Sequence, residues 1–577
     1  MLETQVRYDV SLDKIAQHLL NIRLYIKQPL INQQLTMPNW VPGSYMIRDF
    51  SKNIVTLSAR DGSNAIAVKK LNKSVWQLEF AHEVLEVVVD YSVYCYDSSP
   101  RGAFVDLTRV FFDGCYVFLE ATGKSESQTM LNIETIANWQ CVTSMPSGGA
   151  EHQFMAPNYL TLIDHPVALG NMKVLEFNAA NTLHQISISG ALPQNIDFPR
   201  LVEDVQAICL NHIKFFGELP AMNKYVFILH ISDNGHGGIE HSNSTSLLST
   251  RRSLPLLSEK VKSDAYIGLL SLFSHEYFHL WNVKRIKPAV FVKPNLQAEV
   301  YTRQLWIFEG ITSYYDDFGV LISKCISIDQ YLILLAKTIN RVFNNPGAKI
   351  QNLEESSFEA WGKFYKQDEN AVNSIVSYYA KGAVVALCLD ILLMHKTNGT
   401  HNLGSVLQHL WRDYGKKQIG LLEGEFEKIA SKIAGSDLTE FFDLMVRSAQ
   451  MLPLQEYLQI VGVSFKRAPN SIFDELGIRL KAGTNRVYTT VSGKAAMAAG
   501  VNPGDEIIAI DNIRVSHGNF ESNINACLPG NSVTVQIFRD NVLINLPLNI
   551  PTPQYERIQL TFTEEPDNRL QNRWLDH

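Results

Sequence analysis

Two histidines and a glutamate at fixed spacing could perform metal chemistry in this chain. Residues 275–279 read HEYFH, so His275 and His279 lie four positions apart and Glu276 follows the first of them. In a helix, residues four apart share a face, and both imidazoles can then reach one ion. Such a site needs two neutral nitrogen ligands and a carboxylate that can take a proton from water. We therefore predict a metal site with Glu276 as the general base.

The alternative is a helix with two structural histidines and a solvated glutamate. A third metal ligand is needed to distinguish a metal site from this alternative. Glu309 lies 30 positions after His279, within the otherwise apolar sequence LWIFEGIT. A lone carboxylate in such surroundings requires a partner or a metal. A surface position is the alternative for Glu309. We predict one zinc ion per chain, held by His275, His279 and Glu309.

The sequence GGIEH at 237–241 is a candidate for binding substrate, 35 positions before the first histidine. It follows the apolar run 225–231, which is typical of a strand. Paired glycines let a peptide backbone lie close to an edge strand, and a carboxylate beside them can pair with a free ammonium. We predict that Gly237, Gly238 and Glu240 bind the N-terminal end of a peptide. A glycine turn with a surface glutamate is the alternative.

The elements that must position these residues follow from the hydrophobic pattern. Alternation with period two, clearest at 85–96 and 116–120, predicts strands near the start of the chain. Apolar residues at helical spacing predict helices near 201–215, 260–283, 298–322, 328–344, 371–396, 403–414 and 422–450. The predicted fold class is multidomain α+β, with a β-rich domain (1–165), a mixed α/β part with an edge strand (166–255), a mainly helical domain (256–458), a domain of short strands (459–552) and an irregular tail (553–577).

Composition excludes several classes of protein. The 577 residues exceed what one hydrophobic core supports, and the 46% hydrophobic content is that of a globular protein. A net charge of -7 argues against nucleic acid as a partner. The seven cysteines form no CxxC pair, and no apolar run approaches the roughly 20 residues of a membrane span. We expect no signal peptide, no membrane contact and a cytoplasmic location.

Several motifs, taken in order, resemble the glycyl aminopeptidase family of gluzincins. They are residues 40–49 (WVPGSYMIRD), 109–114, 237–241, 275–282 and 306–315. The resemblance covers nearly the whole chain and implies a β-rich N-terminal domain, a thermolysin-like, mainly helical catalytic domain and a C-terminal PDZ domain. It also implies a zinc aminopeptidase that removes Gly, with Ala as the next candidate. The spacing from His279 to Glu309 is similar to that in this family.

The resemblance also suggests roles for two further residues. GGIEH is similar in place to the Gly-Ala-Met-Glu-Asn motif of the larger aminopeptidase superfamily, whose Glu binds the substrate α-amine, and this role transfers to Glu240. Residues 378–382 (YYAKG) resemble a Tyr-x-Lys-Gly motif whose tyrosine stabilises the tetrahedral intermediate. Tyr379 is the matching position. A core tyrosine is the alternative, and Tyr378 is easily confused with it.

The end of the chain and the basic residues after the histidines allow two interpretations each. Residues 476–478 and 493–511 resemble a PDZ domain, which takes a peptide as an added strand, although it can also serve only as a docking module. Lys284, Arg285 and Lys287 could contact a substrate carboxylate, but a solvated basic helix end is the favoured interpretation. The expected partners are peptide substrates and a possible peptide or protein ligand of the PDZ domain.

The predicted function is a zinc aminopeptidase. A zinc endopeptidase that uses the PDZ domain for substrate selection is the first alternative. The two can be distinguished because only an aminopeptidase requires a free substrate N-terminus. A PDZ-based peptide-binding or scaffolding protein is the second alternative. The intact set of metal ligands and Glu276 argue against it.

Overall fold

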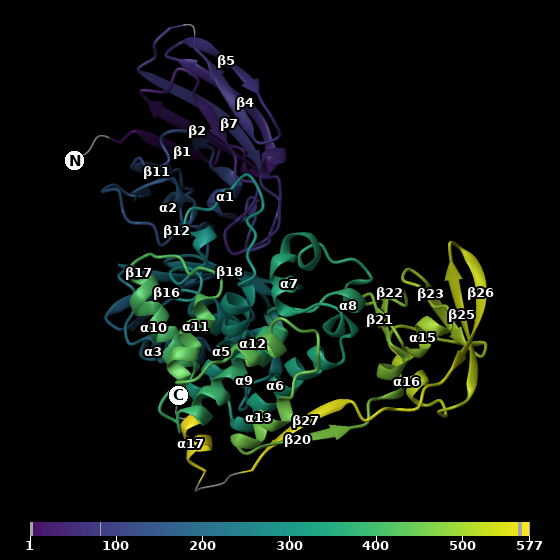
Figure 1. Ribbon diagram of the computed structural model, residues 1–577. Coiled ribbons are helices and arrows are strands. Elements are labelled where there is room, and N and C mark those ends of the chain that lie inside the picture. The colour runs from purple at the N-terminus through teal and green to yellow at the C-terminus, as the bar shows by residue number, and fades with distance from the viewer. Residues whose placement is uncertain (1–3, 81, 564–567, 576–577) are drawn as a thin grey trace. The chain divides into compact units, whose positions relative to one another are not determined.

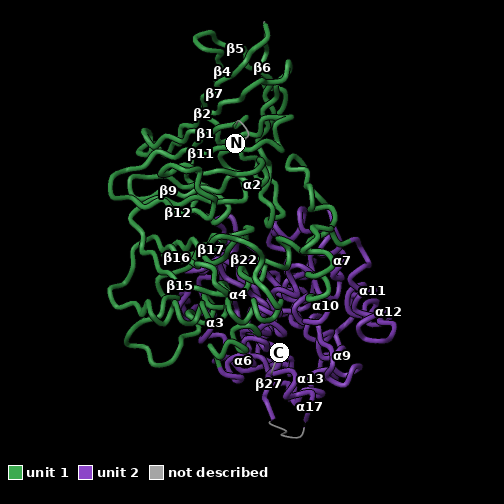
Figure 2. The backbone as a smooth tube through the Cα atoms, turned by 90° about the vertical axis from the view of Figure 1, so that its left-hand side faces the viewer, with its two compact units in different colours: residues 1–300, 318–326, 407–421 green, residues 301–317, 327–406, 422–577 purple. Residues whose placement is uncertain are grey.

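The computed structural model describes residues 4–80, 82–563 and 568–575. These form two compact units, coloured separately in Figure 2. Unit 1 comprises residues 1–300, 318–326 and 407–421, and unit 2 comprises residues 301–317, 327–406 and 422–577. The β-rich N-terminal domain, the helical middle and the C-terminal PDZ region of the predicted fold class are confirmed. The predicted boundaries at 165, 255, 458 and 552 stay predictions.

Unit 1 begins with two β-sheets whose strands alternate buried and exposed side chains. The larger has ten strands in the order β10-β3-β6-β5-β4-β7-β2-β1-β11-β13, and the smaller has four in the order β12-β14-β9-β8. Their bounds are β1 (Val6–Ser11), β2 (Leu19–Lys27), β3 (Gln34–Thr36), β4 (Ile54–Asp61), β5 (Asn64–Lys70), β6 (Val75–Glu79), β7 (Glu86–Tyr94), β8 (Ala103–Val105), β9 (Arg109–Phe112), β10 (Glu120–Ala121), β11 (Thr129–Ile133), β12 (Gln140–Val142), β13 (Gln153–Ala156) and β14 (Val167–Gly170).

One predicted strand in this region is wrong. The alternation at 85–96 is β7, but residues 116–120 do not form the strand that their pattern suggests. The chain instead turns through a buried helical turn, α1 (Gly114–Val117), because the side chain of Asp113 accepts a hydrogen bond from Cys115 N. Only Glu120 and Ala121 join a sheet.

A third sheet in unit 1 has five strands and packs against the helix that carries His275 and His279. Its order is β15-β16-β17-β19-β18, with β16, β17 and β19 parallel and β18 antiparallel at one edge. The elements are β15 (Lys173–Ala179), β16 (Thr182–Gly190), α3 (Phe198–Phe216), β17 (Lys224–Ser232), β18 (Gly237–Glu240), β19 (Ser244–Thr250) and α4 (Asp264–Phe278). The helix predicted at 201–215 and the strand at 225–231 are confirmed as α3 and β17.

Between residues 301 and 460 the chain is mainly helical, as predicted. The helices are α5 (Ile311–Ile322), α6 (Ile328–Phe343), α7 (Leu353–Phe358), α8 (Ala371–Ser374), α9 (Ala380–Lys396), α10 (Leu403–Leu410), α11 (Glu425–Ala434), α12 (Thr439–Met445) and α13 (Leu454–Ile460). The helix expected over 298–322 starts only at a π-helical turn, Trp306–Gly310. The helix expected over 371–396 is interrupted between α8 and α9, where Tyr378 and Tyr379 lie.

The PDZ region has its own core of buried aliphatic side chains within unit 2. Its elements are α14 (Ile472–Leu476), β21 (Ile478–Leu480), β22 (Val487–Thr490), α15 (Ala495–Ala498), β23 (Glu506–Ile510), β24 (Ile513–Arg514), α16 (Phe520–Asn525), β25 (Ser532–Arg539) and β26 (Val542–Asn549). Turns at Pro503 and Pro529 separate strands, as the sequence suggested.

The expectation of an irregular tail after residue 552 is wrong. Strand β27 (Arg557–Phe562) pairs antiparallel with β20 (Val463–Ala468), and the two run side by side in Figure 1. Helix α17 (Arg569–Leu575) follows, and its Trp574 is completely buried and donates to Tyr314 Oη at 3.2 Å. Long-range pairing therefore orders this segment, of which residues 564–567 and 576–577 lie outside the described part.

Two global features bear on the expected location. All seven cysteines carry free thiols. Among helices in the described ranges, none combines the length and apolar character that crossing a bilayer requires.

Candidate active site

Helix α4 presents the two predicted histidine ligands. Ser263 caps its first turn by accepting a hydrogen bond from Tyr266 N, and apolar residues on several faces keep the helix buried. The Nε2 atoms of His275 and His279 lie 3.0 Å apart. Nδ1 of His279 lies 2.7 Å from the carbonyl oxygen of Asn282. Nδ1 therefore carries the proton, and Nε2 keeps its lone pair for a metal.

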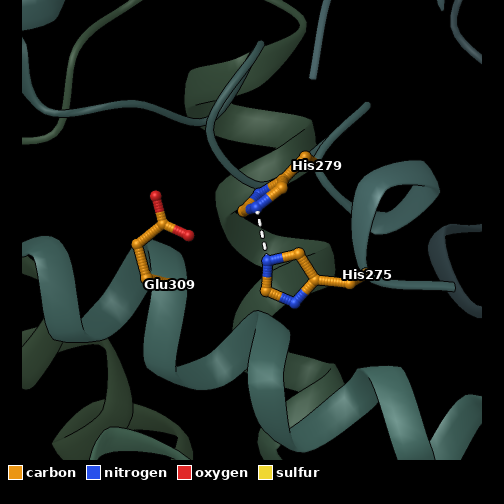
Figure 3. A group of neighbouring side chains, drawn as sticks. All are labelled: His275, His279 and Glu309. Carbon is orange, nitrogen blue, oxygen red and sulfur yellow. Dashed lines mark hydrogen bonds between the residues drawn. The ribbon is translucent and has the colours of Figure 1, made fainter. Parts of the chain in front are cut away.

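Glu309 completes a group of three possible ligands. It belongs to the π-helical turn before α5 and is 2% exposed. Such turns are rare and are frequent at functional sites. The ligand atoms of His275, His279 and Glu309 all lie within 4.8 Å of one another. In Figure 3 the two imidazoles approach each other and the carboxylate points toward them. Two imidazole nitrogens and a carboxylate oxygen are a donor set that suits zinc.

The carboxylate of Glu276 lies against the edge strand of the five-stranded sheet. Glu276 is only 4% exposed, although it directly follows a histidine ligand. A Cβ atom built on Gly238 would come within 2.3 Å of Glu276 Oε1. The strand therefore passes the carboxylate so closely that a larger residue at position 238 would displace the Glu276 side chain.

Glu240, at the end of the same strand β18, has the properties of a binding site for a cation. It is 4% exposed, and within the described part of the chain its Oε1 atom has no hydrogen-bond partner. A buried carboxylate in this state is unfavourable until a cation or donor pairs with it. A Cβ atom on Gly43, whose φ is +98°, would lie 2.4 Å from Oε1. The loop formed by residues 40–49 thus closes one side of this carboxylate.

Arg101 also reaches β18 from the N-terminal domain. Its guanidinium donates to the carbonyl oxygen of Gly238 at 2.6 Å. One of the two lone pairs of this carbonyl oxygen is therefore already engaged. The role of Gly237 and Gly238 in binding the N-terminal end of a peptide stays a prediction, and Arg101 shares that edge of the sheet.

Tyr379 lies at the N-terminal end of α9 and carries a hydrogen bond to a second phenol. Its hydroxyl is 2.9 Å from the hydroxyl of Tyr365, which follows a π-helical turn (Ala360–Phe364). Tyr378 is completely buried, whereas Tyr379 is partly exposed, which favours Tyr379 as the one available to a ligand. A Cβ on Gly310 would be 2.6 Å from Gly382 Cα. These two glycines let α9 approach the turn that holds Glu309.

The interpretation of Lys284, Arg285 and Lys287 as a solvated helix end is wrong. Lys284 donates to Asp164 Oδ1 at 2.7 Å and its side chain is 9% exposed. Arg285 donates to the carbonyl oxygens of Ser242 and Leu280. The cause is long-range packing, because Asp164 belongs to the N-terminal domain, 120 positions before Lys284.

A buried charge network therefore links the N-terminal domain to the segment after Glu240. Burial opposes ionisation of Asp164, but Lys284 and the hydrogen bond from His241 outweigh it and hold the pKa of this carboxyl well below its usual range. Burial raises the pKa of Asp113, which His241 only partly offsets. His241 lies between the two carboxyls, 3.2 Å from Asp164 and 3.7 Å from Asp113.

Sequence reasoning did not identify Arg101, Asp164 or Tyr365. Each is defined by a contact with a residue distant in the chain, or across a broken helix, and no local spacing marks it. The WVPGSYMIRD motif was noticed because it resembles the family's N-terminal motif. That it lies beside Glu240 follows only from the fold.

Comparisons with known proteins identify the class of protein to which this chain belongs. Residues 268–385 match a model described as M61 glycyl aminopeptidase, residues 7–171 match the peptidase M61 N-terminal domain, and residues 475–550 match a PDZ domain. The protein is a metallopeptidase.

Solved structures define the relationship further. The crystal structure of an aminopeptidase N family protein from Idiomarina loihiensis has a TM-score of 0.94 and 36% identity, covering 99% of this chain and 100% of that chain. The present chain belongs to the M61 glycyl aminopeptidase family. An M1 zinc metallopeptidase from Deinococcus radiodurans is more distant, with a TM-score of 0.48, 11% identity and coverage of 78% of this chain and 95% of that chain. A search of curated proteins gives no match.

Proposed function

We propose that this metallopeptidase is a zinc aminopeptidase that removes small N-terminal residues, Gly first and Ala next, from peptides. The observation that carries the proposal is the carboxylate of Glu240, which is buried and whose Oε1 has no hydrogen-bond partner in the described residues. It stands on the strand whose Gly238 lies against Glu276. A substrate ammonium would neutralise this carboxylate, and the first peptide bond would then lie near the base.

Zinc is the proposed metal because the donor set fits it. The Nε2 atoms of His275 and His279 face each other, and the hydrogen bond at Nδ1 of His279 fixes the tautomer whose Nε2 lone pair can coordinate a metal. Glu309 would supply the third ligand. When bound, zinc supplies a Lewis acid that lowers the pKa of water and polarises a carbonyl group.

The chain's own residues divide the remaining work. Glu276 accepts the proton of the attacking water and returns it to the leaving amine. Tyr379 donates a hydrogen bond to the developing oxyanion; as the N-cap residue of α9 it stands at the positive end of the helix dipole, which supports this role. Tyr365 orients that phenol. Glu240 holds the α-ammonium and so fixes which bond is cut.

The preference for small residues is supported by the enclosure of Glu240. Gly43 and its loop lie directly against the carboxylate, so that even an added methyl group at position 43 would collide with it. A first residue with little or no side chain fits beside such a wall. The family description as glycyl aminopeptidase points the same way.

Peptide substrates are the proposed partners of the active site, and a peptide ligand of the PDZ region is a further proposal. Strand β21 pairs with β22 along one edge only in the described sheets, which supports addition of a peptide strand at the other edge. The seven free thiols support a reducing compartment and hence a cytoplasmic location.

A peptide panel tests the proposal. Free and N-acetylated peptides led by Gly, Ala, Leu and Lys are offered to the zinc-loaded enzyme, to the chelated enzyme and to Glu276→Gln. Cleavage of free Gly and Ala peptides, lost in both controls, is the expected result. Cleavage of acetylated peptides would make the enzyme an endopeptidase and would remove the role given to Glu240.

A further inference from the structure

A cavity in unit 1 is lined by none of the proposed catalytic residues. It has a volume of about 110 Å³, enough for roughly several water molecules or a short organic acid. Its walls come from the N-terminal domain and from the segments that follow Glu240 and His279. Apolar side chains form about half of the wall and polar groups form the rest; the apolar part includes Val41, Leu160, Ile163, Phe291 and Val292.

Two lysines and one aspartate bring charge into this cavity, and only one of the three charges lacks a partner. Both oxygens of Asp164 are engaged, Oδ1 by Lys284 and His241 and Oδ2 by the backbone N–H and hydroxyl of Ser242. Lys284 is neutralised by this contact. The ammonium of Lys287 is different, because among the described residues it makes no hydrogen bond or ion pair, and it lines the cavity.

The surroundings of Lys287 leave its charge unmatched in a half-buried position. The titratable groups that act on this lysine are Lys284, Asp164, Arg285 and Glu240, with His241 and Asp113 behind them. Burial, reinforced by Lys284, lowers the pKa of Lys287 to about 8, and Asp164 and Glu240 offset this only in part. An ammonium in this state gains from an anion that can enter the cavity.

We propose that the cavity is a binding site for a monocarboxylate with a short apolar body, whose carboxylate pairs with Lys287. One surplus positive charge matches one negative charge, whereas a phosphate dianion would leave one negative charge unmatched in the cavity. The aliphatic part of the ligand would contact Val41 and Phe291. Such a carboxylate has two chemical sources, a free short-chain acid or the carboxyl terminus of a short peptide.

Binding of butyrate to the zinc-loaded enzyme, measured by calorimetry against butyramide, tests the site. Butyrate binds and the neutral amide, which has the same shape, does not. Lys287→Met weakens butyrate binding by about 10- to 100-fold, the effect of removing a charge-assisted hydrogen bond. Lys287→Arg retains binding. Lys293→Met is the matched control, because Lys293 is exposed and pairs only with exposed Glu126.

Changing the pH adds an independent signature. Raising the pH from 7 to 9 weakens butyrate binding to the wild type as Lys287 loses its proton. Lys287→Arg does not show this loss, because a guanidinium keeps its charge. Thermal unfolding of each variant verifies that it is folded.

N-acetylvaline and its amide identify the source of the carboxylate. If N-acetylvaline binds in a manner that depends on Lys287, a peptide carboxyl terminus is a ligand, and if only butyrate does so, the ligand is a free acid. Equal binding of butyrate and butyramide, or unchanged butyrate binding in Lys287→Met, would overturn the proposal, because the acid would then be bound elsewhere, for example at the metal.

Discussion

Replacing Gly238 by Ala is expected to disable the enzyme by moving the carboxylate of Glu276. The new Cβ would lie 2.3 Å from Oε1, so the carboxylate must retreat by about 1 Å to reach ordinary van der Waals contact. A misplacement of this size costs roughly 100-fold in rate, equivalent to about 2.7 kcal/mol in the activation free energy. We therefore expect kcat/KM for a Gly-led peptide to fall by roughly 100-fold in Gly238→Ala.

A control on the neighbouring helix separates this effect from a general loss of stability. Gly268 lies in the middle of α4, and a Cβ there meets nothing within 4 Å. Gly268→Ala should keep its activity and gain up to about 1 kcal/mol of helix stability. The two variants are compared by steady-state kinetics, metal content and thermal unfolding. Equal activity in Gly238→Ala and Gly268→Ala would refute the idea that this strand confines the base.

Four further predictions follow from the same site. Glu240→Gln should lower kcat/KM for free peptides by about 100-fold and abolish the discrimination against acetylated ones. Tyr379→Phe should lower kcat by roughly 100- to 1000-fold, whereas Tyr365→Phe should lower it by only about 5-fold, since it removes an orienting hydrogen bond. Glu309→Ala should lose its metal on dialysis, as measured by elemental analysis, while retaining its circular dichroism. Lys381 is 1% exposed, and burial lowers its pKa to about 8. As the pH rises, the folded chain therefore releases this proton before the unfolded chain does, and the free energy of unfolding should rise with pH from about 8 to 10.5. Lys381→Met should remove up to about 3 kcal/mol of this rise in urea unfolding.

Each of these predictions has an outcome that contradicts it. Unchanged discrimination in Glu240→Gln would remove the ammonium role. A loss in Tyr365→Phe equal to that in Tyr379→Phe would make Tyr365 the oxyanion donor. Stable metal in Glu309→Ala would exclude it as a ligand. An identical pH dependence in wild type and Lys381→Met would show that another group titrates in that range.

The sequence was most informative where one element supplied the whole signal. The spacing of His275 and His279 requires only an α-helix, and α4 provides it. Strands such as β7 and β17 combine length with β-favouring residues, so local pattern and tertiary packing agree. Residues 557–562 also alternate polar and apolar side chains, but the segment is polar on average, and the prediction of an irregular tail overlooked this signal of β27.

Sequence reasoning was weakest where the decisive contact joins distant segments. The contact of Gly43 with Glu240 joins two domains of unit 1, and the ion pair of Lys284 depends on Asp164. A helix pattern also cannot show where a helix is interrupted, as happens at Tyr378 and Tyr379 before α9. Such contacts depend on how the sheets and helices pack, which neither periodicity nor residue spacing encodes.

The pairing of β20 with β27 makes the PDZ region an insertion rather than a terminal extension. The chain leaves the helical part through β20 and returns to it through β27. There the side chain of Asn340 on α6 donates a hydrogen bond to the carbonyl oxygen of Ile558 and accepts one from its N–H. A truncation before the PDZ region would therefore also strip Trp574 from the helical core. Ala468 and Arg557 are paired neighbours in the two strands. Joining them through a short Asn-Gly turn would remove the PDZ region and keep the pairing of β20 with β27 and the buried Trp574. The PDZ region is thus inserted between two paired strands, so that it can be deleted without removing the segments before and after it.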